Sequence, residues 1–348
     1  MLTQREGQRS KFGLYAGGAT SGIGLTTARR AARRGASLVL VARNEETLRR
    51  LADELSRVGA AAYVVADVGN EEDVRRVSAV ALEQFGRFDT WINNAGVGIF
   101  GRNEEVSTED KRRVLETNFW GVVYGSLVAV QHLKTRGGAL INIGSGFSDR
   151  AAPLQGIYSA SKHAVKGFTD SLRVELEEEG APVSVTLIKP ASVNSMFVAH
   201  AKNYLDVAPR LPPPVYAPET VADAILYAAE HPKRDIHVGG AAKLLAVGAY
   251  RLPGALDWAM KRLMFRLQRT GRPPRPRGQD NLHRPGDDSL ERGPAAWRVH
   301  ETSWYTQAVT HPKMRSALWL GAAVGLLSFL QATRARSRVP SNRSLREP

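Results

Sequence analysis

Three side chains in one short stretch have the types and spacing to move a proton. Tyr158 and Lys162 stand four residues apart, so on a helix they lie on one face, about one turn apart. Ser145 precedes the tyrosine by thirteen residues and follows an apolar run, residues 139–143, that predicts a buried strand. A phenol with its ordinary pKa of about 10 is a poor base at neutral pH, and an ammonium beside it favours the phenolate. We therefore expect Lys162 to lower the pKa of Tyr158, and the Ser145 hydroxyl to hydrogen-bond a carbonyl or alcohol oxygen.

The elements that would position such a site begin near the N-terminus. Taken alone, a Tyr-x-x-x-Lys spacing more often marks a partly buried tyrosine beside a surface lysine. An apolar run at residues 12–16 is followed, however, by GGATSGIG and a helical pattern, which predicts strand, turn and helix. Gly18, Gly22 and Gly24 lack a Cβ, so the backbone can approach a phosphate and the helix can pack close to the strand. The free N–H groups at the start of the helix suit a pyrophosphate.

The next apolar run, residues 37–42, completes a strand–helix–strand unit and ends at Arg43. Sites that bind the 2′-hydroxyl of NAD place an acidic residue near this point, whereas Val41 and Ala42 are neutral and residue 43 is basic. A guanidinium matches a 2′-phosphate by bidentate hydrogen bonding. We therefore favour NADP(H) over NAD(H). The alternative is that Arg43 only pairs with Glu45 or Glu46.

Further polar groups follow the later predicted strands. Residues 63–67 and 90–92 read as strands, and Asp67 at the end of the first could accept a hydrogen bond from an adenine amino group. The sequence Asn-Asn-Ala-Gly at 93–96 could have two roles, lining the adenine ribose and tying neighbouring strands together. The alternative is a loop with ordinary turn chemistry. Asn118 lies inside a predicted helix at 107–133, where asparagine is unfavourable unless it has a partner. That partner is either a backbone group or a water at a kink, or a water held for proton relay behind Lys162.

Together these motifs resemble the short-chain dehydrogenase/reductase family in its classical form, over roughly residues 11–240. The resemblance implies an α/β fold: a doubly wound, mainly parallel Rossmann-type sheet of seven strands in the order 3-2-1-4-5-6-7, with helices on both faces. It implies that Asn118, Ser145, Tyr158 and Lys162 form the catalytic tetrad, with Tyr158 as general acid/base and Lys162 on the nicotinamide ribose. The implied cofactor contacts are Gly18, Thr20, Ser21, Gly22, Ile23, Gly24, Arg43, Asp67, Val68, Asn94, Ala95, Gly96, Tyr158, Lys162, Pro190 and Val193.

Two positions depart from the family pattern. Gly17 stands where a threonine is common, and Ala191 stands where a glycine is common. Neither change removes a catalytic group, so we expect altered cofactor affinity and retained chemistry.

Composition limits the remaining classes of function. The chain of 348 residues has no cysteine, which excludes disulfides and thiolate metal sites, and we expect no metal. Residues 1–239 hold 29 Lys and Arg against 27 Asp and Glu, whereas residues 240–348 hold 19 against 7. The basic character therefore belongs to the tail, whose scattered arginines form no recognisable nucleic-acid module. The polar first ten residues lack the apolar core of a signal peptide, so a cytoplasmic protein is the default expectation.

The predicted organisation has a flexible start at 1–10, a dinucleotide-binding catalytic domain at 11–240 and three tail segments. Residues 241–270 form a basic amphipathic helical segment, which either packs on the domain or a partner subunit or lies on an anionic membrane. Residues 271–310 have the composition of a linker. Within 311–348, an uncharged run of fourteen residues at 317–330 is shorter than the about 20 of a spanning helix, and favours a hairpin, interfacial anchor or docking helix.

These features define two functions to compare. The first is an NADP-dependent oxidoreductase acting on a carbonyl/alcohol pair. Its substrate would be lipophilic, because the stretch at 191–215 combines apolar residues with prolines and could form a lid. The second is a non-catalytic dinucleotide sensor or scaffold that acts through its basic tail. The resemblance also implies a homo-oligomer.

Overall fold

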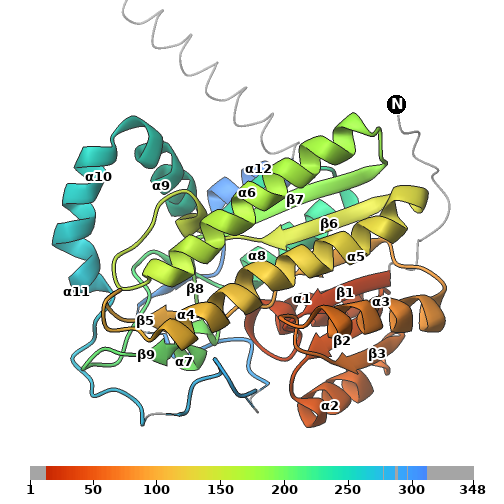
Figure 1. Ribbon diagram of the computed structural model, residues 1–348, viewed down its shortest axis with the longest axis horizontal. Helices are drawn as coiled ribbons and strands as arrows, with labels where there is room; N and C mark the ends of the chain where they lie inside the picture. Colours follow the sequence, from red (N-terminus) through yellow and green to blue (C-terminus); the bar gives the residue numbers. More distant parts are fainter. Residues whose placement is uncertain (1–12, 277, 287–288, 296, 312–348) are drawn as a thin grey trace, which may run out of the picture. The chain divides into compact units, whose positions relative to one another are not determined.

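The computed structural model describes residues 13–276, 278–286, 289–295 and 297–311 (Figure 1). One compact unit comprises Met1–Thr306, and the remainder, Gln307–Pro348, is a second unit. The predicted apolar segment at 317–330 and the predicted flexible start at 1–10 lie outside the described residues.

A seven-stranded sheet forms the centre of the first unit, and all of its strand pairs are parallel. The spatial order is β11-β7-β6-β4-β1-β2-β3, which corresponds to the order implied by the sequence resemblance. The strands are β1 (Gly13–Gly17), β2 (Ser37–Ala42), β3 (Ala61–Val65), β4 (Thr90–Asn93), β6 (Gly138–Ile143), β7 (Val183–Pro190) and β11 (Asp235–Val238).

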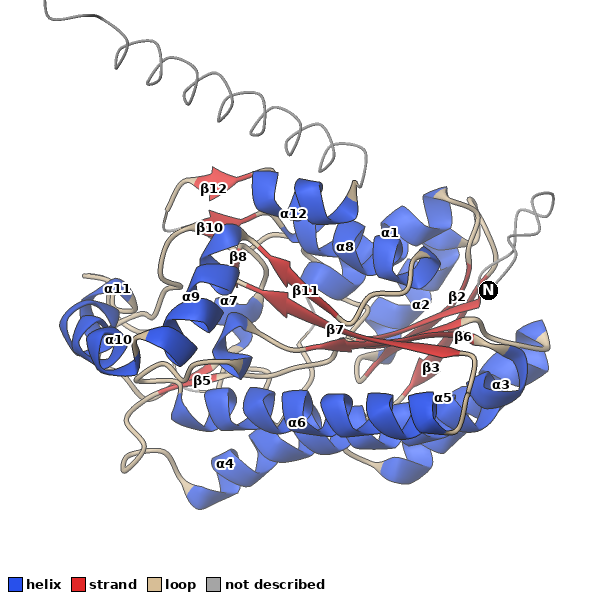
Figure 2. Cartoon of the chain, turned by 90° about the horizontal axis from the view of Figure 1, so that it is seen from above, coloured by secondary structure: helices blue, strands red, loops and turns tan. Residues whose placement is uncertain are grey.

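Helices cover both faces of this sheet (Figure 2). One face carries α1 (Gly22–Arg33), α2 (Glu45–Leu55) and α8 (Pro218–Glu230). The other face carries α3 (Glu71–Phe85), α5 (Gly121–Arg136) and α6 (Gly156–Glu178). Parallel strands covered on both sides are buried, and β4, for example, has four buried residues out of four.

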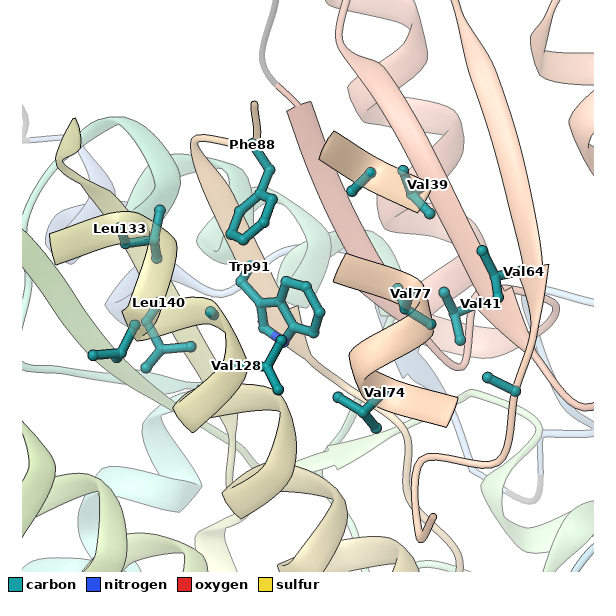
Figure 3. Close-up of a cluster of buried hydrophobic side chains, with 14 of the residues drawn as sticks. Val39, Val41, Val64, Val74, Val77, Phe88, Trp91, Val128, Leu133 and Leu140 are labelled. Atoms are coloured by element: carbon teal, nitrogen blue, oxygen red, sulfur yellow. The ribbon is translucent and has the colours of Figure 1, made fainter. Parts of the chain in front are cut away.

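The core between the sheet and helices α3 and α5 is built around Phe88 and Trp91 (Figure 3). Trp91 is fully buried, and its indole N–H donates to Asn93 Oδ1 over 2.9 Å. Asn93 in turn donates to Asn142 Oδ1 over 2.8 Å. Asn93 therefore ties β4 to β6, which is one of the two roles that the sequence indicated for the Asn-Asn-Ala-Gly segment.

The single helix expected at 107–133 is interrupted. It consists of α4 (Thr108–Leu115), a π-helical turn η1 (Glu116–Trp120) and α5, with Ser107 Oγ accepting a hydrogen bond from Asp110 N at its start. Asn118 lies inside the π turn. Such turns insert one extra residue into a helix and are frequent at functional sites.

Shorter elements connect these layers. They are β5 (Ile99–Phe100), η2 (Gly146–Ser148), β8 (Ser192–Val193), α7 (Phe197–His200), β9 (Lys202–Asn203) and β10 (Val215–Tyr216). Beyond β11 the chain forms α9 (Gly240–Arg251), α10 (Pro253–Ala259), η3 (Met260–Met264), α11 (Phe265–Leu267), β12 (Val299–His300) and α12 (Trp304–Thr310).

The segment at 271–310 differs from the linker that its composition indicates. Its strand β12 pairs with β10, and residues 271–306 belong to the same compact unit as the catalytic domain. Arginine guanidinium groups and backbone amides of that domain hydrogen-bond its carbonyl oxygens, interactions that a composition rich in proline and glycine does not reveal.

The helical segment after residue 240 also differs from a single amphipathic helix. It consists of α9 and, after a break at Leu252, a continuous helical stretch formed by α10, η3 and α11. Within that stretch Met260 is buried, whereas Leu263 is 53% exposed. Among the described residues, no helix is both long and apolar enough to cross a membrane.

Candidate active site

Ser145, Tyr158 and Lys162 meet in the wall of one cavity of about 310 Å³. Ser145 follows the end of β6 and caps η2, where its Oγ accepts a hydrogen bond from Phe147 N. Tyr158 and Lys162 lie near the start of α6. The cavity is at the carboxyl ends of the strands, where parallel α/β sheets bind their ligands.

The Tyr158 hydroxyl is in an environment that keeps it protonated. Burial raises the pKa of Tyr158 to about 12, and the nearby Ser145 side chain acts in the opposite direction without reversing the shift. The ring of Phe197 packs against the Tyr158 ring with centroids 5.1 Å apart. The expectation of a lowered phenol pKa is therefore wrong for this structure.

The position of Lys162 explains why the pKa of Tyr158 is not lowered. Its Nζ donates to the carbonyl oxygen of Ile143 over 2.8 Å and lies 5.9 Å from the centroid of the Tyr158 ring. Burial lowers the pKa of Lys162 to about 8, because the charged form loses its hydration. The Lys162 ammonium thus lies over the Tyr158 ring and donates to the backbone of β6. Desolvation therefore has the largest effect on the pKa of the Tyr158 hydroxyl.

Asn118 is fully buried beside these groups but does not line the cavity. Its Oδ1 accepts from Val97 N over 2.8 Å, and its Nδ2 donates to Val97 O and to Ser161 Oγ. The side chain therefore fixes the loop after β4 to the helix that carries Tyr158. The sequence predicted a polar partner for Asn118, and in the structure its partners are the backbone of Val97 and the hydroxyl of Ser161.

The glycine-rich turn fits a dinucleotide phosphate. Gly18 and Gly22 have positive φ angles of 68° and 55° and line the cavity. An added Cβ at Gly22 would stand 3.0 Å from the Cβ of Ser195. A side chain there would fill the space beside Gly18 and Gly22, which we call the glycine cradle. Ser21 precedes α1 without making a side-chain cap and also lines the cavity. Gly24 has a different role, because its Cβ position is 2.1 Å from Gly18 O and only glycine permits this packing.

A second cavity of about 120 Å³ continues the first. The two share Gly18, Ser21, Ala95 and Gly96 in their walls, so they form one groove from the turn to the end of β2. Of the predicted cofactor residues, the first cavity is lined by Gly18, Ser21, Gly22, Ile23, Asn94, Ala95, Gly96, Tyr158, Lys162, Pro190 and Val193. The second is lined by Gly18, Thr20, Ser21, Arg43, Asp67, Val68, Ala95 and Gly96.

Arg43 and Asp67 reach the second cavity with partners that the sequence did not indicate. Arg43 donates to backbone carbonyl oxygens of residues 281, 282 and 284, and not to Glu45 or Glu46. Asp67 forms an ion pair with Arg113 and accepts a hydrogen bond from Gly69 N. Two arginines and one carboxylate therefore meet at this end of the groove.

Several lining residues were missed by sequence reasoning. Leu245 of α9 and Met264 of η3 come from beyond the recognised family core, and Gln155 and Phe147 carry no motif. The predicted lid contributes Met196, Phe197 and Leu211, whereas the Tyr204 hydroxyl instead donates to Asp110. No group of acidic or histidine side chains suited to a metal ion occurs within the described parts of the chain.

The comparisons agree with this geometry. A family model described as "short chain dehydrogenase" matches residues 15–204. An uncharacterized oxidoreductase of Bacillus subtilis (strain 168), YxnA, is 46% identical over 323 residues, covering 92% of this chain and 90% of its own. An 11-beta-hydroxysteroid dehydrogenase A of Arachis hypogaea is 39% identical over 181 residues, which is 51% of each chain.

Solved structures of short chain dehydrogenases are also similar to this chain. A short chain dehydrogenase/reductase from Burkholderia phymatum in complex with NAD has a TM-score of 0.63 and 28% identity, covering 72% of this chain and 95% of its own. A short chain dehydrogenase from Burkholderia cenocepacia J2315 in complex with NADP has a TM-score of 0.62 and 25% identity, covering 73% and 98%.

Proposed function

Because the chain belongs to the short chain dehydrogenase family, and is therefore an NAD(P)-dependent oxidoreductase of CH–OH and C=O groups, we propose that it prefers NADP(H), acts on a lipophilic carbonyl/alcohol pair and uses Tyr158 as general acid/base. The observation that carries the proposal is the meeting of Ser145, Tyr158 and Lys162 in one wall of a cavity that also contains the glycine cradle. A non-catalytic scaffold would not need these three side chains in one place.

The residues divide the chemistry among them. When bound, the nicotinamide dinucleotide supplies or accepts the hydride. With its pKa raised to about 12, Tyr158 holds a proton at neutral pH and can donate it to the oxygen of a carbonyl undergoing reduction. Ser145, which lines the same cavity as Tyr158, orients that oxygen. Lys162 supplies a positive charge that favours the phenolate left after proton donation.

The preference for NADP(H) is supported by charge at the second cavity. Arg43 stands in its wall, and its hydrogen-bond partners are neutral carbonyl oxygens. Asp67 is already paired with Arg113, and Arg43 forms no ion pair with an acidic side chain of the described residues. A guanidinium in the cavity wall favours the additional phosphate of NADP(H).

The preference for a lipophilic substrate is supported by the lining of the first cavity beside Tyr158. Apolar side chains from separate segments of the chain face it: Phe147, Met196, Phe197, Leu211, Leu245 and Met264. Burial of apolar substrate surface against such a lining contributes roughly 25 cal/mol per Å².

The test is nicotinamide oxidation against a panel of aldehydes and ketones, with NADPH and NADH in parallel, for wild type, Tyr158→Phe and Arg43→Ala. We expect turnover with lipophilic carbonyl compounds that disappears in Tyr158→Phe. We also expect Arg43→Ala to lower the NADPH to NADH ratio of kcat/KM by roughly tenfold or more, the usual value of a charge-assisted hydrogen bond. NADPH binding without turnover on any compound would favour the sensor or scaffold. Turnover confined to small polar ketones or sugars would contradict the lipophilic substrate.

A second candidate property is contact with an anionic membrane surface through residues 241–270. Leu244, Tyr250, Leu252 and Trp258 of α9 and α10 and the turn between them are 74%, 79%, 64% and 60% exposed, which is unusual for large apolar side chains. Helix α9 also contributes Ala242 and Leu245 to the cavity, so a docked face would lie next to the substrate entrance. Figure 1 shows α9, α10 and α11 as an arch at the edge of the sheet domain.

Vesicle flotation tests this contact. We expect wild type to float with vesicles containing an anionic phospholipid, to float less with neutral vesicles, and to lose binding in the variant Leu244→Ser, Trp258→Ser. Truncation after residue 270 is unsuitable, because residues beyond it pack on the catalytic domain. Failure to float would contradict the membrane contact, and a dimer abolished by the same two substitutions would assign this face to the predicted homo-oligomer.

A further inference from the structure

A strap from the C-terminal part of the chain crosses the cofactor groove. We use "strap" for residues 280–286 and 290–293, which follow the helices α9 to α11. Figure 1 shows this region in blue, passing beside α7 and β9. Asn281 N donates to His200 O over 2.9 Å, and Gly293 N donates to Asn194 O over 3.3 Å. Both ends of the strap are therefore attached to the segment between β7 and β10.

Strap backbone groups meet the adenosine end of the groove. Arg43 donates to Leu282 O and Arg284 O over 3.2 Å each, and also to Asn281 O. Asn44 Nδ2 donates to Gly286 O over 3.0 Å. Residues Asn281, Pro285 and Gly286 line the second cavity opposite the predicted cofactor residues, so the strap forms its roof and leaves space beneath.

Leu282 anchors the strap by burial. Its side chain is fully buried in a cluster with Ile99, Val106 and Val114. Its carbonyl oxygen also accepts from Arg113 Nε over 3.1 Å. Full burial of a leucine contributes about 1.5–3 kcal/mol relative to exposure, so this contact favours a closed strap.

A latch holds the strap to the helix of the glycine cradle. Glu291 accepts from Thr26 Oγ1 over 2.8 Å and from Arg29 Nη1 over 2.7 Å. The neighbouring carbonyl oxygen of Leu290 accepts from Gly22 N, the first amide of α1, over 2.9 Å. The strap therefore touches the helix start that suits a pyrophosphate, at its edge, while Ser21 and Ile23 still line the first cavity.

We propose that the strap is part of the cofactor site: it covers the adenosine half of a bound nicotinamide dinucleotide, and the Glu291 latch must open for the dinucleotide to enter or leave. The inference rests on the dinucleotide cofactor alone and is independent of the substrate and of the preference for NADP(H). It predicts slow exchange of either cofactor. Because the roof is built mainly from backbone carbonyl oxygens, it should slow NADPH and NADH alike.

The first experiment measures cofactor release. The fluorescence of bound NADPH or NADH is followed in a stopped-flow instrument after addition of excess oxidised cofactor. Glu291→Gln removes the carboxylate of the latch, and Glu54→Gln is the matched control, because Glu54 pairs with the same Arg29 from α2 and not from the strap. We expect release of both cofactors to be roughly tenfold faster in Glu291→Gln, consistent with loss of charge-assisted hydrogen bonds, and within about twofold of wild type in Glu54→Gln.

The second experiment observes the strap itself. The chain has no cysteine, so Leu282→Cys provides a single thiol that reacts with a thiol reagent only when the strap lifts. We expect saturating NADPH to slow this reaction, since the closed strap covers the cofactor. In the same background, Glu291→Gln should accelerate it.

The outcomes are distinct. Equal rates of cofactor release in wild type, Glu291→Gln and Glu54→Gln would overturn the strap proposal. Faster thiol labelling of the Leu282→Cys variant with NADPH bound would do the same. Neither result would affect the proposed function. Acceleration by Glu54→Gln as large as that by Glu291→Gln would also overturn the strap proposal, since the effect would belong to Arg29. If neither cofactor bound to wild type, the inference and the proposed function would fail together.

Discussion

The two ends of the cofactor groove are built differently. At the catalytic end, Ser145 and Lys162 are buried. Ser145 lies just after β6 and Lys162 lies in α6, two elements that are close together in the sequence. At the adenosine end, Arg43 of the β2 loop is bonded to carbonyl oxygens far along the chain, with a sequence separation of 238 for Asn281. In the proposed site the reacting side chains are thus held by elements close together in the sequence, whereas the proposed retention of the cofactor depends on a contact between distant segments.

Charge is distributed differently as well. Behind the catalytic end, Lys189 Nζ lies 3.1 Å from Asp149 Oδ2 and His237 Nε2 lies 3.5 Å from it, and all three side chains are almost completely buried. At the adenosine end, the charged groups form the cavity wall. The buried group of Asp149, Lys189 and His237 stabilises the fold, whereas the charged groups in the cavity wall are available to a ligand. The following predictions test that division, beginning with the largest expected effect.

Tyr158→Phe should reduce turnover by about 10²–10⁴-fold, the usual contribution of a general acid/base. Binding of NADPH, followed by fluorescence titration, should remain within about twofold, since the ring and its packing on Phe197 are kept. A large loss of cofactor affinity would show that the catalytic end of the groove also determines how tightly the cofactor binds.

The pH dependence of kcat/KM should report Lys162. Its pKa is lowered to about 8, so the ammonium is present below that pH and is lost above it. We expect kcat/KM for reduction to fall about tenfold per pH unit above about pH 8. Lys162→Arg keeps its charge throughout this range, so its profile should lack that limb even if its activity is lower. Persistence of the limb in Lys162→Arg would assign it to another group.

Asp149→Asn should lower the free energy of unfolding by about 2 kcal/mol at pH 7. Burial would raise the pKa of Asp149, but His237, whose Nε2 lies 3.5 Å from Asp149 Oδ2, and the charge of Lys189 hold it at about 2, below the ordinary 3.8. The stabilisation is therefore complete above pH 3.8 and disappears as the pH falls through about 2. Urea unfolding between pH 7 and pH 2 should show this loss in wild type and not in the variant.

Gly96→Ala should weaken binding of both cofactors by about tenfold without unfolding the protein, because a methyl group would project into the groove. Its Cβ would stand 3.5 Å from Asn118 Oδ1 and 3.7 Å from Lys162 Nζ, which are ordinary contacts. Fluorescence titration gives the affinity and thermal unfolding gives the stability. An affinity equal to wild type would place the cofactor elsewhere.

Gly167→Ala provides the smallest effect and a comparison for Gly96→Ala. Gly167 lies within α6, and an added Cβ meets no heavy atom within 4 Å. Alanine should stabilise the fold by about 0.5–1 kcal/mol through helix propensity, with no change in cofactor affinity. A measurable effect on binding would mean that α6 transmits changes to the groove.

Local pattern was sufficient for much of the framework. The run at 37–42 is a strand with the predicted bounds. Apolar periodicity and glycine placement are local properties, and in a parallel sheet they already fix which loops meet at the carboxyl edge. The interruption at Asn118 was not predictable, because it depends on bonds to Val97 and Ser161 from other elements.

What the sequence determined is therefore individual strands such as the run at 37–42, the glycine turn, the sheet order through its resemblance to a family, and the choice of Ser145, Tyr158 and Lys162 as candidate site residues. The tertiary structure decided the sign of the Tyr158 pKa shift, the partners of Arg43 and the roof formed by a segment whose composition indicated a linker. The physical reason is common to all three. Desolvation and hydrogen bonding at a given atom depend on the groups that surround it in space, and here those groups come from segments that no short-range pattern connects.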